Sequence, residues 1–166
     1  MKMKIRQTTP KEIDRLLSIY DYARSFMQKT GNANQWINGY PSKEQVMADL
    51  AEKNSYVCVN EHNEVIATFY FKTGDDPTYS KIYQGEWLNS KPYGVVHRLA
   101  SDGSQKGIAA FCLQWCFEQC KNIRVDTHHD NLVMQNILRK LGYIECGIIY
   151  VANGTERIAF QKTEKP

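Results

Sequence analysis

The chain has 166 residues, the size of one domain that can bury a substantial core, so we expect a single domain over residues 1–166. Its composition, 42% hydrophobic and 23% charged, excludes intrinsic disorder, and its net charge of +3 is scattered, which argues against nucleic-acid or membrane-surface partners. No stretch approaches the ~18 apolar residues of a membrane span, and no apolar run follows the N-terminal charges as in a secretory signal.

The first half of the chain predicts one strand, two helices and then two more strands. After a strand over residues 3–8, Thr9 and Glu12 form a capping box with Pro10 at the first helical position. The helix that follows carries an apolar stripe from Ile13 to Met27. A second capping box at residues 42–45 opens a shorter helix through about residue 50. Strands are expected at residues 55–60 and 64–72.

The second half alternates strands and helices. A polar loop that carries Trp87 leads to these predicted elements: strand 93–101, helix 108–119, strand 122–128, helix 131–141, and strands 143–152 and 156–161 around an Asn-Gly turn. Strand–helix–strand passages require parallel neighbours and hairpins require antiparallel ones. The sequence therefore predicts an α/β fold with a mixed sheet.

Five cysteines give no pattern of a metal site or a disulfide framework. Cys112, Cys116 and Cys120 recur every four residues inside a predicted helix and have no second ligand cluster. We interpret them as free thiols in a reducing compartment, which predicts a cytoplasmic protein.

The most informative junction is the one between strand 93–101 and helix 108–119. The strand ends in a polar turn over residues 102–106, and Gly107 and Ala109 then open the helix. Unpaired main-chain N–H groups and the helix dipole converge there, Lys106 adds positive charge, and small side chains let a phosphate approach. The junction thus suits a pyrophosphate, although a glycine that only packs the helix on the sheet is an equal alternative.

Two segments resemble motifs of the GNAT acetyltransferases. Residues 104–109, Ser-Gln-Lys-Gly-Ile-Ala, are similar to the family's Gln/Arg-x-x-Gly-x-Gly/Ala motif, with Ser104 replacing a phosphate-directed side chain. Residues 131–143 are similar to its Asn-x-x-Ala-x-x-Leu-Tyr-x-Lys-x-Gly-Phe segment. The element order also matches. The resemblance implies the acyl-CoA N-acyltransferase fold, a mixed, mostly antiparallel central sheet with helices on both faces.

The resemblance also implies acetyl-CoA as cosubstrate and no metal. Main-chain amides near Leu99 would contact the acyl group and pantetheine, the turn before Gly107 would hold the pyrophosphate, and Asn131 would contact the pantetheine arm. The cofactor-binding residues implied in this way are Leu99, Ala100, Ser101, Ser104, Gln105, Lys106, Gly107, Ile108, Ala109, Asn131 and Met134.

Leu138 stands where many family members carry the tyrosine that protonates the leaving thiolate. A leucine cannot donate a proton, but it fits the apolar stripe of its predicted helix. Either main-chain amides and water stabilise the thiolate without a proton donor, or another hydroxyl or thiol group donates the proton. Tyr143 and Tyr150 are the candidates.

Transfer to an amine also needs a group that removes a proton near neutral pH. His97 and His128 are the leading candidates, with Glu86 behind them; alternation places His97 on the face of Val95 and Leu99. A role for His128 in capping the next helix with Asp130 is equally compatible. We predict no metal at residues 128–130, because adjacent residues of an extended chain point opposite ways.

Loop aromatics flanked by polar residues often line a binding cleft. Trp36, Tyr40 and Trp87 are therefore the candidate substrate-binding residues, although both tryptophans could equally close the ends of the core.

We therefore expect an N-acetyltransferase that moves an acetyl group from acetyl-CoA to a primary amine, of a small molecule or a peptide, in a ternary complex. The alternative is a non-catalytic CoA-binding or regulatory module of the same fold. No Gly-x-Gly-x-x-Gly or Walker motif supports another phosphorylated ligand. Exposed edges of the two C-terminal strands favour a homodimer.

Overall fold

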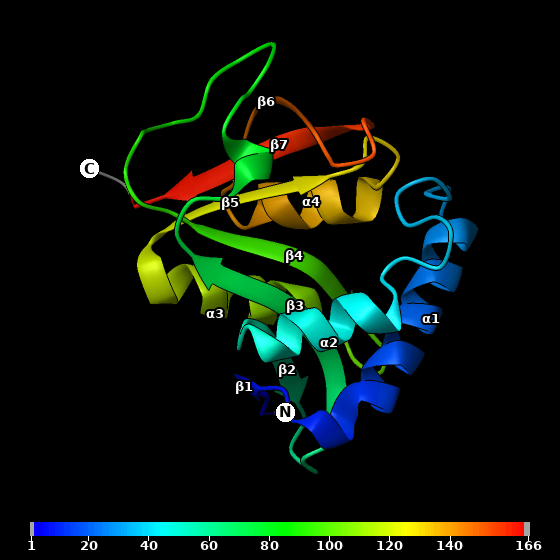
Figure 1. Cartoon of the computed structure of the whole chain (residues 1–166). Coiled ribbons are helices and arrows are strands. Elements are labelled where there is room, and N and C mark those ends of the chain that lie inside the picture. The colour runs from blue at the N-terminus through cyan, green and yellow to red at the C-terminus, as the bar shows by residue number, and fades with distance from the viewer. Residues whose placement is uncertain (1, 165–166) are drawn as a thin grey trace.

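The computed structural model describes residues 2–164 and forms one seven-stranded sheet with four α-helices (Figure 1). The elements in chain order are β1 (Lys4–Gln7), η1 (Pro10–Glu12), α1 (Ile13–Lys29), α2 (Lys43–Ala51), β2 (Ser55–Val59), β3 (Val65–Thr73), η2 (Pro77–Tyr79), β4 (Gly94–Ser101), α3 (Ile108–Cys120), β5 (Asn122–Thr127), α4 (Leu132–Lys140), β6 (Ile144–Tyr150) and β7 (Glu156–Thr163). Every predicted helix and strand is present. The short 3-10 helix η2 was missed, because three residues carry no periodicity.

Both predicted helix starts are confirmed. The main-chain N–H of Thr9 donates to Oε1 of Glu12 at 2.9 Å, which completes the first capping box. Ser42 Oγ accepts from the N–H of Gln45 at 3.1 Å. The second box closes on one side only, since the Gln45 side chain donates to Asp49 instead.

The sheet order is β1-β2-β3-β4-β5-β7-β6; β4 and β5 are parallel neighbours, and the other five pairs of these seven strands are antiparallel. One apolar cluster joins the sheet to α3 and α4, and another joins it to α1 and α2. Figure 1 shows these helix pairs on the two faces of the sheet. The predicted fold class, mixed and mostly antiparallel with helices on both faces, is confirmed.

β4 and β5 separate soon after they meet. They pair only at Gly94 with Ile123 and at Val95 with Arg124, although β4 runs on to Ser101. On its other side β4 bulges where it faces β3, and within the bulge Arg98 has a left-handed φ of 54°. The C-terminal half of β4 is therefore not paired with β5, and Figure 1 shows the two strands as diverging arrows.

The bulge also corrects the predicted face of His97. Its ring packs beside Tyr70 and Tyr79, in the cluster that contains Val95. Leu99 packs into the cluster on the α3 side instead. Simple alternation put His97 and Leu99 on one face, and that prediction is wrong, because the extra residue of a bulge reverses the side-chain pattern beyond it.

The C-terminal strands do not both present an edge. β7 lies between β5 and β6 and is paired on both sides, so the expectation of a free edge at β7 is wrong. β6 is the edge strand at that end of the sheet, and one residue of the loop between η2 and β4 already pairs with it: Tyr83 and Ile148 exchange two main-chain hydrogen bonds of 2.8 Å. The homodimer stays a prediction.

All five cysteines are free thiols, four of them buried. Among the helices of residues 2–164, none has the combined length and apolar character that crossing a membrane requires.

Candidate active site

Two cavities meet the bulged segment of β4. His97 and Arg98 line a cavity of about 530 Å³, which we call the acceptor-side cavity. The next residues, Leu99, Ala100 and Ser101, line a second cavity of about 200 Å³, which we call the cofactor-side cavity. Adjacent residues of one strand therefore serve two cavities, at the place where β4 and β5 diverge.

The cofactor-side cavity collects residues that lie far apart in the sequence. It is lined mostly by apolar side chains from α1, the end of β4 and α4: Tyr22, Ala23, Phe26, Met27, Thr30, Leu99, Ala100, Ser101, Gly103, Ala109, Asn131, Val133, Met134 and Ile137. Six of the residues implied by the family resemblance are in this list. Such a lining suits an uncharged, flexible arm.

The polar turn before α3 and the first residue of that helix carry the remaining implied cofactor residues, Ser104 to Ile108, outside that lining. Gly107 has a left-handed φ of 79°, and a Cβ placed there would find open space. No side chain caps α3, so its first N–H groups stay available for an anion. Ile108 is 2% exposed and packs in the core, so only its main chain can face a ligand.

Contacts of Asp102 and Gly103 shape the same turn. Asp102 accepts a hydrogen bond from the N–H of Ser104 at 2.9 Å and pairs with Arg15 at 2.7 Å. A Cβ at Gly103 would lie 2.4 Å from the Tyr22 hydroxyl, so the Tyr22 side chain would have to move, and the φ of 70° also favours glycine. The turn is thus held from both sides, which preorganises its main-chain donors.

The acceptor-side cavity has a more polar lining. It is formed by the loop between α1 and α2, by β4, β5 and η2, and by the β6–β7 hairpin: Gln35, Trp36, Ile37, Asn38, Tyr40, Ser42, Thr78, His97, Arg98, Asp126, Val151, Ala152, Asn153 and Arg157. Trp36 and Tyr40, two of the predicted substrate-binding residues, are in this lining.

Trp87, the third predicted substrate-binding residue, lies outside both cavities. Its indole N–H donates to the Tyr79 carbonyl at 3.1 Å, and the guanidinium of Arg124 stacks over its ring at 4.3 Å. The neighbouring Glu86 is exposed and lines neither cavity. The contacts of Trp87 are those of a residue that closes one end of the core.

Arg98 is anchored by a buried carboxylate. Two of its nitrogen atoms donate to Asp49 at 2.8 Å each, and a third donates to the Tyr40 hydroxyl at 3.0 Å. The Tyr20 hydroxyl donates to the Arg98 carbonyl at 3.2 Å. This network fixes the bulge of β4 against α1 and α2.

His97 is held by Asp76. Nε2 of the imidazole lies 2.7 Å from Oδ2 of Asp76, whose other oxygen accepts from the N–H of Thr78 at 2.8 Å. Burial would raise the pKa of Asp76, but the hydrogen bond and charge of His97 outweigh it and lower the value to about 2. An ionised carboxylate thus orients one imidazole nitrogen, while the ring itself lines the acceptor-side cavity.

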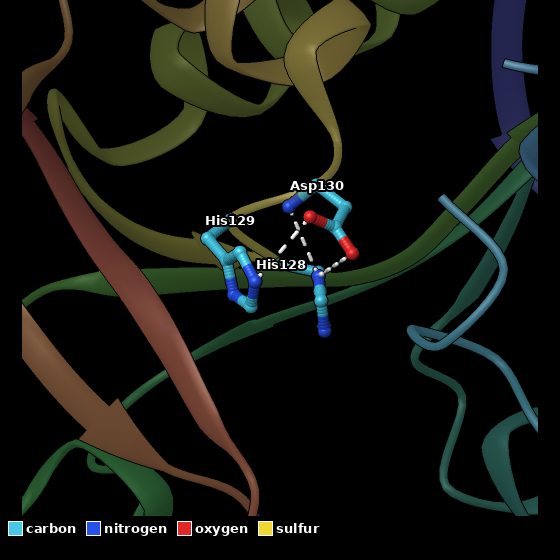
Figure 2. Close-up of side chains that lie close together, drawn as sticks. All are labelled: His128, His129 and Asp130. Atoms are coloured by element: carbon cyan, nitrogen blue, oxygen red, sulfur yellow. Dashed lines mark hydrogen bonds and ion pairs between the residues drawn. The ribbon is translucent and has the colours of Figure 1, made fainter. Parts of the chain in front are cut away.

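His128 and its neighbours form a compact cluster after β5 (Figure 2). The N–H of Asp130 donates to Nδ1 of His128 at 3.0 Å, and the rings of His128 and His129 stack with centroids 4.3 Å apart. The expectation that these two side chains point opposite ways is wrong, because β5 ends at Thr127 and the chain turns there.

The surroundings of His128 fit the alternative that this residue has a structural role with Asp130 at the start of the next helix. Its side chain is 8% exposed, and burial, followed by the charges of His129 and Arg157, lowers its pKa. Potential metal-ligating atoms of residues 128–130 lie within 4.8 Å of one another, but Nδ1 of His128 is engaged by the main chain. His128 lines neither cavity.

The candidate proton donors lie away from both cavities. Tyr143 is 5% exposed in the core on the α3 side, its hydroxyl has no hydrogen-bond partner among residues 2–164, and burial raises its pKa well above the ordinary value. Tyr150 is exposed and packs against Tyr83. Leu138 is fully buried in the same core as Tyr143.

Sequence reasoning did not single out several polar residues of the acceptor-side cavity, among them Gln35, Asp126 and Arg157. The side-chain oxygen of Gln35 accepts from Asn131 at 3.0 Å, and its carbonyl accepts from Arg157 at 3.1 Å. This residue ties the α1–α2 loop to both cavities. No local pattern reveals these contacts, because they span more than 90 residues of sequence.

Of the comparisons with known proteins, only the one with solved structures gave matches. No family model matches the chain, and no curated protein matches it. Among solved structures, a GNAT-family acetyltransferase from Streptococcus agalactiae is 32% identical, with a TM-score of 0.88 over 99% of this chain and 96% of that one. A GNAT-family acetyltransferase from Listeria monocytogenes (12% identity, TM-score 0.71, 96% and 94% covered) and an N-acetyltransferase from Staphylococcus aureus (15%, 0.66, 99% and 100%) share the fold.

Proposed function

The chain belongs to the GNAT family of acetyltransferases, and from this premise we propose that it is an N-acetyltransferase. It transfers an acetyl group from acetyl-CoA to a primary amine, by direct attack in a ternary complex. The observation that carries the proposal is the divergence of β4 from β5 with a cavity on either side of one bulge. Two substrates that enter the two cavities would meet at this bulge.

The residues of the cofactor side fit acetyl-CoA. Unpaired N–H groups after Gly107 and the charge of Lys106 suit a pyrophosphate, and the apolar lining that ends at Asn131 suits the pantetheine arm. Main-chain groups of Leu99 to Ser101 would orient the acyl carbonyl. When bound, acetyl-CoA supplies an activated thioester carbonyl, at which a C–N bond to the amine forms as the C–S bond breaks.

His97 is the base of this proposal. Asp76 accepts the Nε2 hydrogen bond, so Nδ1 is left with a lone pair that can take the proton of the attacking amine. The carboxylate of Asp76 stabilises the imidazolium that results. Since Leu138 carries no acidic proton and Tyr143 is buried away from the cavities, the departing sulfur obtains its proton from solvent.

Release of free CoA thiol from acetyl-CoA, measured across a panel of primary amines, tests the proposal. An amine-dependent rate, with the acetylated product identified by mass spectrometry, is the expected result. Tight CoA binding in a titration without thiol release for any amine would instead favour a non-catalytic CoA-binding module. Both experiments use the purified full chain.

We place the protein in the cytoplasm as part of this proposal. The support is that all five cysteines are free and that four of them are buried within the fold.

A further inference from the structure

Two arginines line the acceptor-side cavity, and only one of them has a counter-ion. Arg98 is paired with Asp49 through two hydrogen bonds. Arg157 donates only to neutral oxygen atoms: Thr155 Oγ1 at 3.0 Å, the Glu156 carbonyl at 3.0 Å and the Gln35 carbonyl at 3.1 Å. Within the described part of the chain, no carboxylate oxygen lies within 4.0 Å of its guanidinium.

Burial makes that unpaired charge informative. Arg157 is 6% exposed, and burial lowers its pKa despite the nearby charge of Asp126. A buried guanidinium without a counter-ion is costly, and its planar fork of donors matches a carboxylate. Arg124 is equally buried, but it stacks on Trp87 and Tyr93 at 4.3 and 4.0 Å and lies outside the cavity.

The same cavity also contains an unpaired carboxylate. Asp126 on β5 accepts a hydrogen bond from the Tyr79 hydroxyl at 2.6 Å, and among residues 2–164 no cationic nitrogen lies within 4.0 Å of it. The sheet order β4-β5-β7 places Asp126 nearer the opening between β4 and β5 than Arg157. The cavity thus offers an anion close to the reacting centre and a cation one strand farther away.

From this arrangement we infer that the acceptor is a small amine that also carries a carboxylate, of the amino-acid type. Arg157 binds the carboxylate, and the amino group lies near Asp126 and His97. The inference rests on the proposed function, because it names the acceptor class of that reaction. A cavity of about 530 Å³ is in the range of small-molecule sites.

Matched pairs of acceptors test the inference on the unaltered protein. Suitable pairs are γ-aminobutyrate with butylamine, lysine with cadaverine, and alanine with alaninamide, each assayed for CoA thiol release with acetyl-CoA. We expect kcat/KM to be ~10–100-fold higher for the carboxylate member of at least one pair, as for a charge-assisted hydrogen bond. Equal rates within every pair overturn the inference and leave the proposed function standing. If no amine is acetylated, both the inference and the proposed function are contradicted.

Substitution of Arg157 adds a second test. Arg157→Gln is expected to raise KM for the preferred carboxylate acceptor by ~10–100-fold with little change in kcat, and to change KM for the partner that lacks a carboxylate far less. Arg157→Lys keeps the charge and should recover part of the affinity. Arg139→Gln, which removes an exposed arginine, is the matched control. An equal loss for both members of a pair would assign Arg157 a structural role and overturn the inference. If Arg157→Gln does not fold, the paired acceptors still decide.

Discussion

Nε2 of His97 lies 2.7 Å from Oδ2 of Asp76, a contact that joins β4 to the loop ahead of η2 and sets the imidazole at the wall of the acceptor-side cavity. Because a general base contributes ~10²–10⁴-fold in rate, His97→Ala should lower kcat by that factor with CoA affinity unchanged. The acidic limb of the pH–rate profile should flatten. His62→Ala, at an exposed histidine, is the control. Wild-type turnover with an unchanged pH profile would exclude His97 as the base.

The pKa of Asp76 predicts a pH-dependent contribution to stability. Its folded-state value of about 2 lies below the ordinary 3.8, so the ionised carboxylate stabilises the folded protein above about pH 4. This stabilisation is lost as the pH falls through the folded pKa. Relative to Asp76→Asn, the wild-type protein should have a free energy of unfolding about 1–2 kcal/mol higher near pH 6. Urea denaturation should show this difference shrinking between pH 4 and pH 2; a constant difference would contradict the assignment.

Gly107 is the position at which a side chain should abolish CoA binding. A Cβ there extends into open space beside the turn, and a left-handed φ of 79° strains any β-branched residue, so Gly107→Val should distort the amide cradle. Calorimetric titration should detect no CoA binding by the folded variant. Gly154→Val, at a glycine with φ 84° in the β6–β7 hairpin, imposes the same strain elsewhere. Equal CoA affinity of wild type and Gly107→Val would remove the turn from the cofactor site.

The buried pair of Arg98 and Asp49 should dominate the electrostatic stability of the site. Asp49→Asn leaves the guanidinium without its counter-charge and should cost about 3–5 kcal/mol in urea unfolding. Glu145→Gln breaks the exposed pair with Arg139 and should cost less than about 1 kcal/mol. Equal effects of the two substitutions would mean that water reaches the pair.

Tyr143→Phe should leave turnover unchanged. The hydroxyl is buried without a hydrogen-bond partner among the described residues, so its removal should be neutral or stabilising by about 1 kcal/mol. Thermal unfolding and steady-state kinetics with acetyl-CoA measure the two quantities. A tenfold fall in kcat with unchanged stability would return Tyr143 to the catalytic candidates.

Local sequence signals determined the elements of this protein. Thr9 with Glu12, and Ser42 with Gln45, start helices where predicted, because a cap depends on residues three positions apart. Gly107 could also be singled out at the start of α3, because a turn and the helix start that follows it are encoded within a few residues. Of the six implied cofactor residues that line one cavity, Ala109, Asn131 and Met134 belong to the two motifs with fixed spacing, and the stretch from Leu99 to Ser101 was implied by the family resemblance.

Tertiary structure alone decided which side chains share a cavity. The bulge at Arg98 moved Leu99 to the opposite face from His97, and its position depends on pairing with β3 across 30 residues. Arg157 reaches the site only because β7 inserts between β5 and β6, an order that hairpin turns do not specify. Elements follow from contacts between neighbours in sequence, whereas the acceptor site depends on strand order and register, which are set by packing between distant segments.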